Sequence, residues 1–203
     1  MAKRERPHTL AAIDRAIHAC CRCSIGYLDN VAVMGEGPAD ARLMIVGEQP
    51  GDQEDRQGRP FVGPAGRVLD EHLAEAGIDR DRAYVTNAVK HFKYAPRGKR
   101  RLHQKPTTGE IDICRWWLES EIEVIKPRLV LAMGTSAAQA MLGKPVTLAK
   151  ARGKSHPLAD GREVWVTTHP SYLLRLRDRM KEEQDALFKA DLAKVAKRLK
   201  ELA

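Results

Sequence analysis

Four short apolar runs, each ended by glycine or polar residues, stand out along the chain. Their length and their β-branched residues are typical of buried strands. They lie at about 42–46 and within AYVTNAV (83–89), RLVLAMG (128–134) and EVWVTTHP (163–170). Around them, apolar residues recur at three- and four-residue spacing, which predicts helices at 9–19, 64–76, 110–127, 135–142 and 181–202.

Caps and apolar stripes support these helix assignments. Thr9 is placed to cap the first helix, and Gly77 to end the second. Strands that alternate with helices predict an α/β fold, with a mostly parallel sheet and helices on both of its faces. We expect one domain over residues 1–203, with residues 92–109 as a long polar, basic loop. The stripes on the two longest helices are Cys114, Leu118, Ile122 and Ile125, and Phe188, Leu192, Val195, Leu199 and Leu202.

Distinctive polar residues follow each predicted strand. GEQPGDQED follows the first strand, and Asn87 ends the second. Gly134 and Thr135 follow the third, and HPS (169–171) follows the fourth. Any one of these could be a turn or a helix cap. In an open α/β sheet, however, ligands bind beyond the carboxyl ends of the strands, so together they predict one binding crevice.

Composition is that of a globular protein. Hydrophobic residues make up 43% and charged residues 31% of the 203 residues. No apolar run approaches the roughly 20 residues of a membrane span, and the basic N-terminal stretch lacks the apolar segment of a secretion signal. We therefore expect a cytoplasmic protein without a membrane partner.

The net charge of +8 points to a polyanionic partner, most simply nucleic acid, although a basic but inert surface would give the same total. The positive charge is concentrated between residues 93 and 105, where no acidic residue occurs. His103 lies within this stretch, so a side chain that titrates near neutral pH is surrounded by fixed positive charge. The basic residues are Lys93, Arg97, Lys99, Arg100, Arg101 and Lys105.

The four cysteines are Cys20, Cys21, Cys23 and Cys114. In a reducing compartment we do not expect them to form disulfides. Cys20 and Cys23 form a C-x-x-C pair, which indicates a metal, an iron–sulfur cluster or redox chemistry.

Three strand-end segments resemble the uracil-DNA glycosylase superfamily: VGEQPG (46–51), YVTNAVK (84–90) and HPSYLLR (169–175). The C-x-x-C pair and Cys114 resemble its iron–sulfur family-four branch. GEQPGDQED together with KRRLHQKP (99–106) resembles the UdgX sub-branch, which carries isoleucine where this chain has Leu102. The resemblance covers about Cys20 to Arg175. It implies a three-layer α/β/α sandwich around a four-stranded parallel sheet, which agrees with the four strands above.

The resemblance implies an enzyme of the hydrolase class that cleaves the N-glycosidic bond of uracil in DNA and releases free uracil. Asn87 matches the asparagine that reads uracil through its carboxamide, and a strand-end cap is the alternative. Phe61 matches the aromatic residue that stacks on the uracil ring, and a plain core residue is the alternative. Gly47, Gln49 and Asp52 are assigned to the same uracil-binding site.

Three residues carry the implied chemistry. His169 matches the histidine that hydrogen-bonds uracil O2 and stabilises the leaving anion, while Glu48 is placed to stabilise the sugar cation or accept a proton. His103 matches the UdgX histidine that captures C1′ and stays attached, so the enzyme inactivates itself after effectively one turnover. Arg100 and Arg101 disfavour a protonated imidazole, Glu48 favours it if close, and the sequence leaves this balance open. On the alternative hypothesis, His103 only contacts phosphate.

Hydrolytic family-four proteins have a cysteine where this chain has His91, in TNAVKHF (86–92). Since Cys20, Cys23 and Cys114 are retained, we predict a [4Fe–4S] cluster with three cysteine ligands and one histidine ligand. We expect the cluster to be structural. Zinc held by the same four residues is the alternative.

The partner implied is uracil-containing DNA, with single strands expected and duplex DNA as an alternative. A monomer is expected, because DNA must reach the crevice. Two other functions stay open: a hydrolytic, multiple-turnover iron–sulfur uracil-DNA glycosylase, and a non-catalytic iron–sulfur DNA-binding module. The expected DNA contacts are Lys99, Arg100, Arg101, Ser171, Leu174 and Arg175, with Tyr172, Leu173 or Leu174 as a wedge into the base stack.

Overall fold

The computed structural model describes residues 5–202, and the predicted strands form one central sheet in them. Four parallel strands, in the order β2-β1-β5-β7, confirm the predicted sheet, and β6 adds an antiparallel edge strand beside β7. The first four residues of the basic N-terminal stretch lie outside the described residues. The strands of the sheet are β1 (Leu43–Gly47), β2 (Ala83–Asn87), β5 (Leu129–Met133), β6 (Ser155–Pro157) and β7 (Glu163–Thr167).

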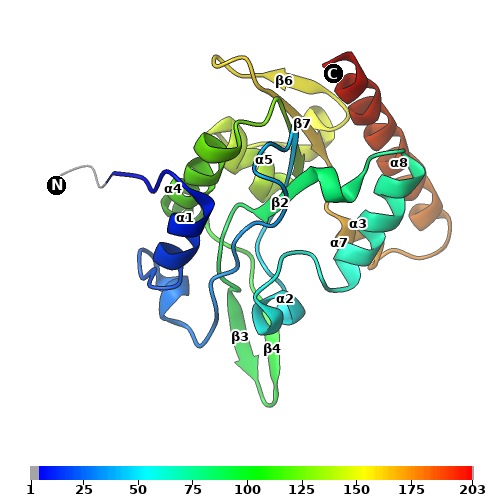
Figure 1. The fold of residues 1–203 in the computed structure, drawn as a ribbon. Helices are drawn as coiled ribbons and strands as arrows, with labels where there is room; N and C mark the ends of the chain where they lie inside the picture. Colours follow the sequence, from blue (N-terminus) through cyan, green and yellow to red (C-terminus); the bar gives the residue numbers. More distant parts are fainter. Residues whose placement is uncertain (1–4, 203) are drawn as a thin grey trace.

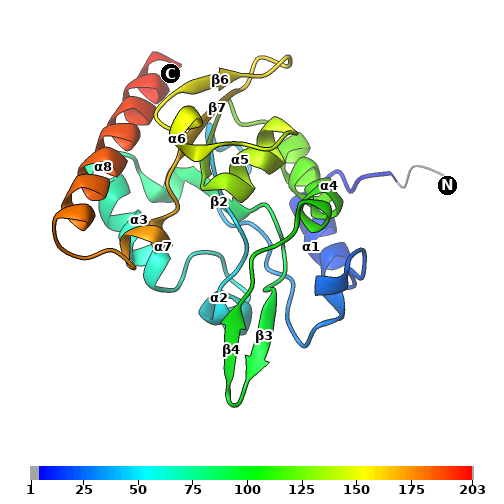
Figure 2. The same cartoon turned by 180° about the vertical axis from the view of Figure 1, so that it is seen from behind.

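Helices cover both faces of this sheet (Figures 1 and 2). One face packs against α1, α4 and α5, and the other packs against α3 and α8. Among residues 5–202, no helix has both the length and the apolar character needed to cross a membrane. The helices are α1 (Leu10–Ile17), α2 (Asp52–Gln57), α3 (Pro64–Glu75), α4 (Thr108–Ile125), α5 (Thr135–Leu142), α6 (Leu148–Ala151), α7 (Pro170–Leu173) and α8 (Asp178–Glu201), with short 3-10 helices at Ser24–Tyr27 and Arg80–Arg82.

The three layers follow from the alternation of side chains along each strand. In β1, Met44 and Val46 point into the core formed with α1, α4 and α5, while Leu43 and Ile45 point into the core formed with α3 and α8. All five residues of β1 are buried. A strand covered on both faces is apolar throughout, which is why the sequence shows continuous runs rather than an alternating pattern.

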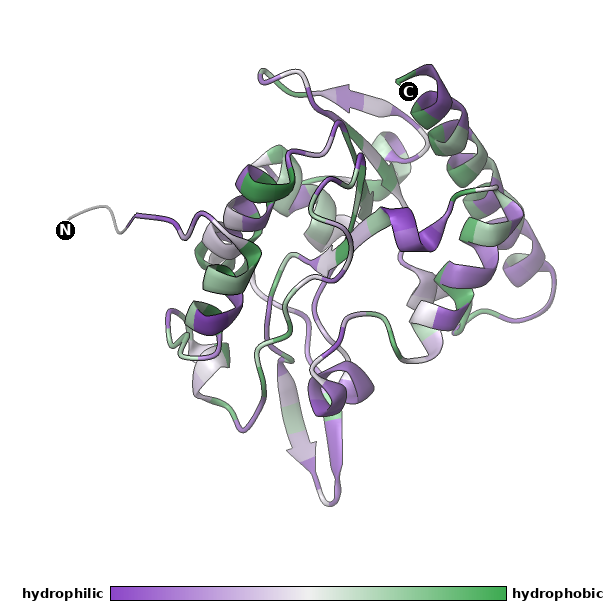
Figure 3. Ribbon diagram, in the orientation of Figure 1, coloured by the Kyte–Doolittle hydropathy of each residue, from purple (hydrophilic) through white to green (hydrophobic). Residues whose placement is uncertain are grey.

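The prediction of a loop over residues 92–109 is wrong in part, because this basic stretch folds into an antiparallel hairpin. Strands β3 (Tyr94–Arg97) and β4 (Arg100–His103) pair with each other and not with the central sheet. Gly98, at φ +57°, makes the tight turn between them. Figure 1 shows the hairpin extending away from the body of the protein, and Figure 3 shows that hydrophilic residues dominate both the hairpin and the neighbouring α2.

Candidate active site

The carboxyl ends of the four parallel strands border a cleft of about 740 Å³. Strand register brings these ends level, since Gly47 pairs with Asn87 and Met133 pairs with Thr167. The segments that follow the strands therefore meet at one edge of the sheet, as predicted for a ligand site. The cleft is lined by many of the predicted site residues, namely Glu48, Gln49, Phe61, Asn87, His103, His169, Ser171 and Arg175.

Glu48 is the polar centre of the cleft. His103 Nε2 lies 3.1 Å from Glu48 Oε1, and Ser136 Oγ donates a hydrogen bond of 2.6 Å to Glu48 Oε2. Partial burial raises the pKa of Glu48, but the hydrogen bonds from His103 and Ser136 outweigh it and hold the pKa below its usual value. Glu48 is therefore a charged carboxylate with both oxygens held in place. The sequence predicts that Arg100 and Arg101 repel positive charge on His103. The Glu48 carboxylate, 3.1 Å from His103, opposes this repulsion.

His169 is held as a neutral hydrogen-bond donor. The backbone N–H of Ser171 donates to His169 Nδ1 at 3.2 Å, so the proton of the neutral ring is on Nε2. Burial lowers the pKa of His169 to about 4, with Glu48 opposing this shift and Arg175 and His103 adding to it. The ring is therefore uncharged at neutral pH, with an N–H available to an acceptor in the cleft.

We expect His169 to make folding stability depend on pH on the acid side of neutrality. Its pKa falls from 6.5 in the unfolded chain to about 4 in the folded protein, so protons bind the unfolded chain preferentially in this range. The contribution of the neutral His169 ring to the free energy of unfolding is complete above pH 6.5 and is lost as the pH falls towards 4. Chemical denaturation across this range should show a steeper loss of stability in the wild type than in His169→Gln. Equal slopes would contradict the neutral, buried ring.

Asn87 and Phe61 form the deep wall of the cleft, next to Gly47. Asn87 is 2% exposed, and its Oδ1 has no hydrogen-bond partner within the described residues. Phe61 adopts a left-handed backbone conformation, φ +56°, which is uncommon for a bulky residue and typical of functional sites. A Cβ added at Gly47 would lie 2.4 Å from Asn87 Oδ1 and 2.5 Å from Phe61 Cζ, so glycine is required for this wall to form.

The Gln49 side chain lines the cleft but is used to hold the hairpin. Its Nε2 donates to the carbonyl of Gln104 at 3.1 Å and to that of Lys93 at 3.3 Å, and its Oε1 accepts from the Lys93 N–H at 3.1 Å. Lys93 and Gln104 directly flank the two hairpin strands. Because Glu48 precedes Gln49 and His103 precedes Gln104, this clamp also brings Glu48 and His103 together.

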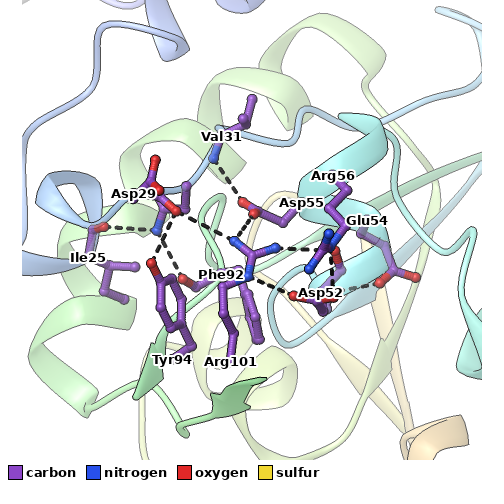
Figure 4. Close-up of polar contacts among 12 residues, drawn as sticks. Ile25, Asp29, Val31, Asp52, Glu54, Asp55, Arg56, Phe92, Tyr94 and Arg101 are labelled. Atoms are coloured by element: carbon purple, nitrogen blue, oxygen red, sulfur yellow. Dashed lines mark hydrogen bonds and ion pairs between the residues drawn. The ribbon is translucent and has the colours of Figure 1, made fainter. Parts of the chain in front are cut away.

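Arg101 is tied into the protein by a cluster of acids (Figure 4). Its Nε donates to Asp52 Oδ1 at 2.7 Å, its guanidinium pairs with Asp55, and it stacks 5.1 Å from the centre of the Tyr94 ring. Asp55 also accepts the N–H of Val31 at 2.8 Å. Asp52 thus holds the hairpin against α2 and is not among the residues that line the cleft. Lys99 and Arg100, in contrast, are exposed near the tip of the hairpin.

The segment after β7 borders the mouth of the cleft. Ser171, Tyr172 and Arg175 line the cleft, and Leu173 is buried. Leu174, which follows α7, is 49% exposed beside them. Of the three residues predicted as a wedge into DNA, Leu174 is thus the apolar side chain that is accessible to a ligand outside the cleft.

Comparison with known proteins identifies the family. The sequence profile of the uracil DNA glycosylase superfamily matches residues 34–194. The chain belongs to this superfamily. It is similar to the type-4 uracil-DNA glycosylase of Thermotoga maritima, with 38% identity over 85% of this chain and 86% of the relative. It is also similar to the type-4 uracil-DNA glycosylase of Archaeoglobus fulgidus, with 33% identity over 89% and 90%, and to the type-5 uracil-DNA glycosylase of Pyrobaculum aerophilum, with 31% identity over 68% and 64%.

The predicted iron–sulfur ligands of this superfamily member are only partly brought together. Cys20 and Cys23 pack against the core that contains Cys114, and the Lys90 N–H donates to Cys114 Sγ at 3.2 Å. Burial raises the pKa of the Cys114 thiol to about 12, and the neighbouring Cys23 and Cys20 add to this. In residues 5–202, however, no three His, Cys, Asp or Glu side chains are grouped to hold a metal ion. The thiols suit the donor chemistry of a cluster, and the buried His91 directly follows Lys90, whose N–H contacts Cys114 Sγ.

Sequence reasoning missed some residues of the site. Ser136 orients Glu48, and Lys105 lines the cleft with its Nζ 3.3 Å from Thr135 Oγ1. Ser136 follows the third strand end, and Lys105 is the last residue of the basic stretch between residues 93 and 105. Their positions after Thr135 and His103 are the signal that could have found them.

Proposed function

We propose that this member of the uracil-DNA glycosylase superfamily excises uracil from DNA and then captures the abasic sugar on His103, as in the UdgX branch. The observation that carries the proposal is the contact of 3.1 Å between His103 and Glu48 inside the cleft. A histidine that served only to bind phosphate would need no carboxylate beside it. A histidine that attacks a sugar carbon needs a base to take its proton.

Asn87 and Phe61, which form the deep wall of the cleft, are the residues that we assign to uracil recognition. The carboxamide of Asn87 can accept from uracil N3–H through the unpaired Oδ1 and donate to O4 through its amino group. Leaving that buried acceptor unpaired costs about 1–3 kcal/mol, which uracil would recover on binding. Phe61 provides a face on which the extruded base stacks, and Leu174 is placed to fill the gap left in the DNA.

Bond cleavage and capture use the three polar residues described above. The bond from C1′ to uracil N1 breaks with its electron pair on the base, and the His169 N–H stabilises that anion at O2. The Glu48 carboxylate stabilises the positive charge that develops on the sugar. A lone pair of the His103 imidazole then forms a bond to C1′, the remaining ring proton passes to Glu48, and uracil regains a proton from solvent.

A hydrolytic, multiple-turnover glycosylase is the second candidate, because the relatives at 33–38% identity are named type-4 uracil-DNA glycosylases. In that reaction a water molecule would capture the sugar and His103 would contact DNA. Both candidates require DNA binding, for which Lys99, Arg100 and Arg175 are available. A DNA-binding module without catalysis would use the same surface and release no uracil.

The deciding experiment mixes the protein with a uracil-containing single-stranded oligonucleotide and with the matched thymine oligonucleotide, and analyses both on a denaturing gel. A uracil-dependent band at the summed mass, with the adduct mapped to His103, supports capture. Free uracil without such a band would establish the hydrolytic enzyme. If neither product forms, the DNA-binding module without catalysis is the remaining candidate. A parallel series with duplex DNA gives the strand preference.

We also propose that Cys20, Cys23 and Cys114 hold a [4Fe–4S] cluster, with His91 as the fourth ligand. The C-x-x-C spacing and the proximity of Cys114 support this. Ligation requires the thiols to lose their protons, and the role of the group here is to join the N-terminal segment to α4. Absorbance at about 400 nm with stoichiometric iron and sulfide is expected. Colourless protein that contains one zinc per chain would contradict the cluster.

A further inference from the structure

His103 lies at the end of a hairpin that stands apart from the central sheet. Its position is therefore set at the neck, where Lys93 leads into β3 and Gln104 leaves β4. The Gln104 N–H donates to the Lys93 carbonyl at 2.9 Å, which closes the neck. Tyr94, the residue after Lys93, is the register partner of His103. Any shift of Lys93 is thus passed directly to His103.

The Glu110 carboxylate, at the start of α4, holds this neck through the Lys93 side chain, whereas Gln49 holds it through the backbone. Lys93 Nζ donates to Glu110 Oε2 at 2.7 Å, and Ser24 Oγ donates to Oε1 at 2.9 Å. Oε2 also accepts the Thr107 N–H at 2.7 Å. Burial raises the pKa of Glu110, but these donors outweigh it and lower the pKa to about 2. Glu110 is therefore charged at any pH at which the protein would be assayed.

Helix capping explains only part of this arrangement. Thr107 and Glu110 form a capping box, in which the Thr107 side chain accepts the Glu110 N–H and Glu110 accepts the Thr107 N–H. That motif needs neither Lys93 nor Ser24. Glu110 joins the helix start to two distant segments, the entrance to the hairpin and the residue after Cys23. Such a connection fixes the entrance to the hairpin relative to the start of α4.

We propose that Glu110 is a positioning residue that sets the place of His103, through Lys93, so that the imidazole rather than water meets C1′. The proposal rests on the capture reaction proposed above. Glu110 is not among the residues that line the cleft, and Lys93 is not among them either. We therefore expect Glu110 to affect whether His103 or water captures the sugar, and not how the cleft recognises the base. Capture by a positioned group is sensitive to displacements of about 1 Å.

The test measures, for each variant, the fraction of released uracil that is accompanied by a covalent adduct. In Glu110→Gln this fraction should fall by roughly tenfold or more while uracil is still released. Lys93→Met should give the same loss, and the double variant should lose no more than either single variant because both remove one contact. If Lys93 instead served to bind phosphate, Lys93→Met would weaken DNA binding in a salt-dependent way and Glu110→Gln would not.

Two controls separate positioning from stability and from charge. Thr107→Ala removes the hydroxyl that caps the helix and also donates to Glu110 Oε2, but it keeps the Lys93–Glu110 pair and the Thr107 N–H. Asp112→Asn removes an exposed charge on the same helix. Both should keep the adduct fraction of the wild type. An unchanged fraction in Glu110→Gln and in Lys93→Met, or an equal fall in Thr107→Ala, would overturn the proposal. A wild-type protein that releases uracil without any adduct would overturn the capture reaction, and this inference with it.

Discussion

Asn87→Ala is expected to slow uracil release from DNA by about 10²- to 10⁴-fold while the protein stays as stable as the wild type. Both halves of this result follow from the same observation. The Asn87 Oδ1 is buried and has no partner in the described part of the protein, so truncation removes no internal hydrogen bond at that atom. On the proposed mechanism, the same truncation removes the acceptor for uracil N3–H and the donor for O4.

The alternative, that Asn87 is only a strand-end cap, makes the opposite prediction. A cap lost from the end of β2 would lower the free energy of unfolding and leave the chemistry of a correctly folded molecule largely intact. Single-turnover uracil release and chemical denaturation of Asn87→Ala therefore decide between the two. Binding of undamaged single-stranded DNA is the internal control, because it depends on the basic surface and should not change. A large stability loss with normal release would contradict the assignment.

Residues that act at the end of a strand could be predicted from the sequence. Asn87, Glu48 and His169 each follow a run of buried apolar residues, and parallel strands necessarily bring their carboxyl ends to one edge. The helix that begins after Thr9 could be predicted for a similar reason, since its cap and its apolar face are local. In these cases the information lies within a few residues of the position concerned.

Residues that act across long stretches of chain could not be predicted in the same way. The sequence marks Gln49 as part of a motif, yet its clamp on Lys93 and Gln104 depends on a hairpin formed about fifty residues later. The hairpin strands could not be predicted from hydrophobic patterning, because they are largely exposed and carry arginine where a buried strand would carry valine. Arg101 appeared free to bind phosphate, whereas Asp52 and Asp55 are its partners in the folded chain.

His103→Ala is expected to abolish the covalent adduct completely while uracil release stays within about tenfold of the wild type. On the proposed mechanism, release depends on Asn87, Phe61 and His169, none of which is bonded to His103, and on Glu48, which keeps its hydrogen bond from Ser136 when the imidazole is removed. The space left by the imidazole admits water beside Glu48, so the sugar should be hydrolysed and the enzyme should turn over. His8→Ala is the matched control, since it removes an exposed histidine far from the cleft in sequence. The adduct in that variant should equal that of the wild type.

Loss of the adduct alone would not separate a nucleophile from a residue that only positions one, and a rescue experiment does so. In His103→Gly, free imidazole can enter the vacated space and bond to C1′, giving DNA that carries one imidazole and no protein. The bound side chain has an effective concentration far above that of any solute, so rescue should need high imidazole concentrations. Mass analysis of the oligonucleotide would identify the product. A protein–DNA adduct that persisted in His103→Gly would place the nucleophile elsewhere, and the basic hairpin would then contribute DNA contacts alone.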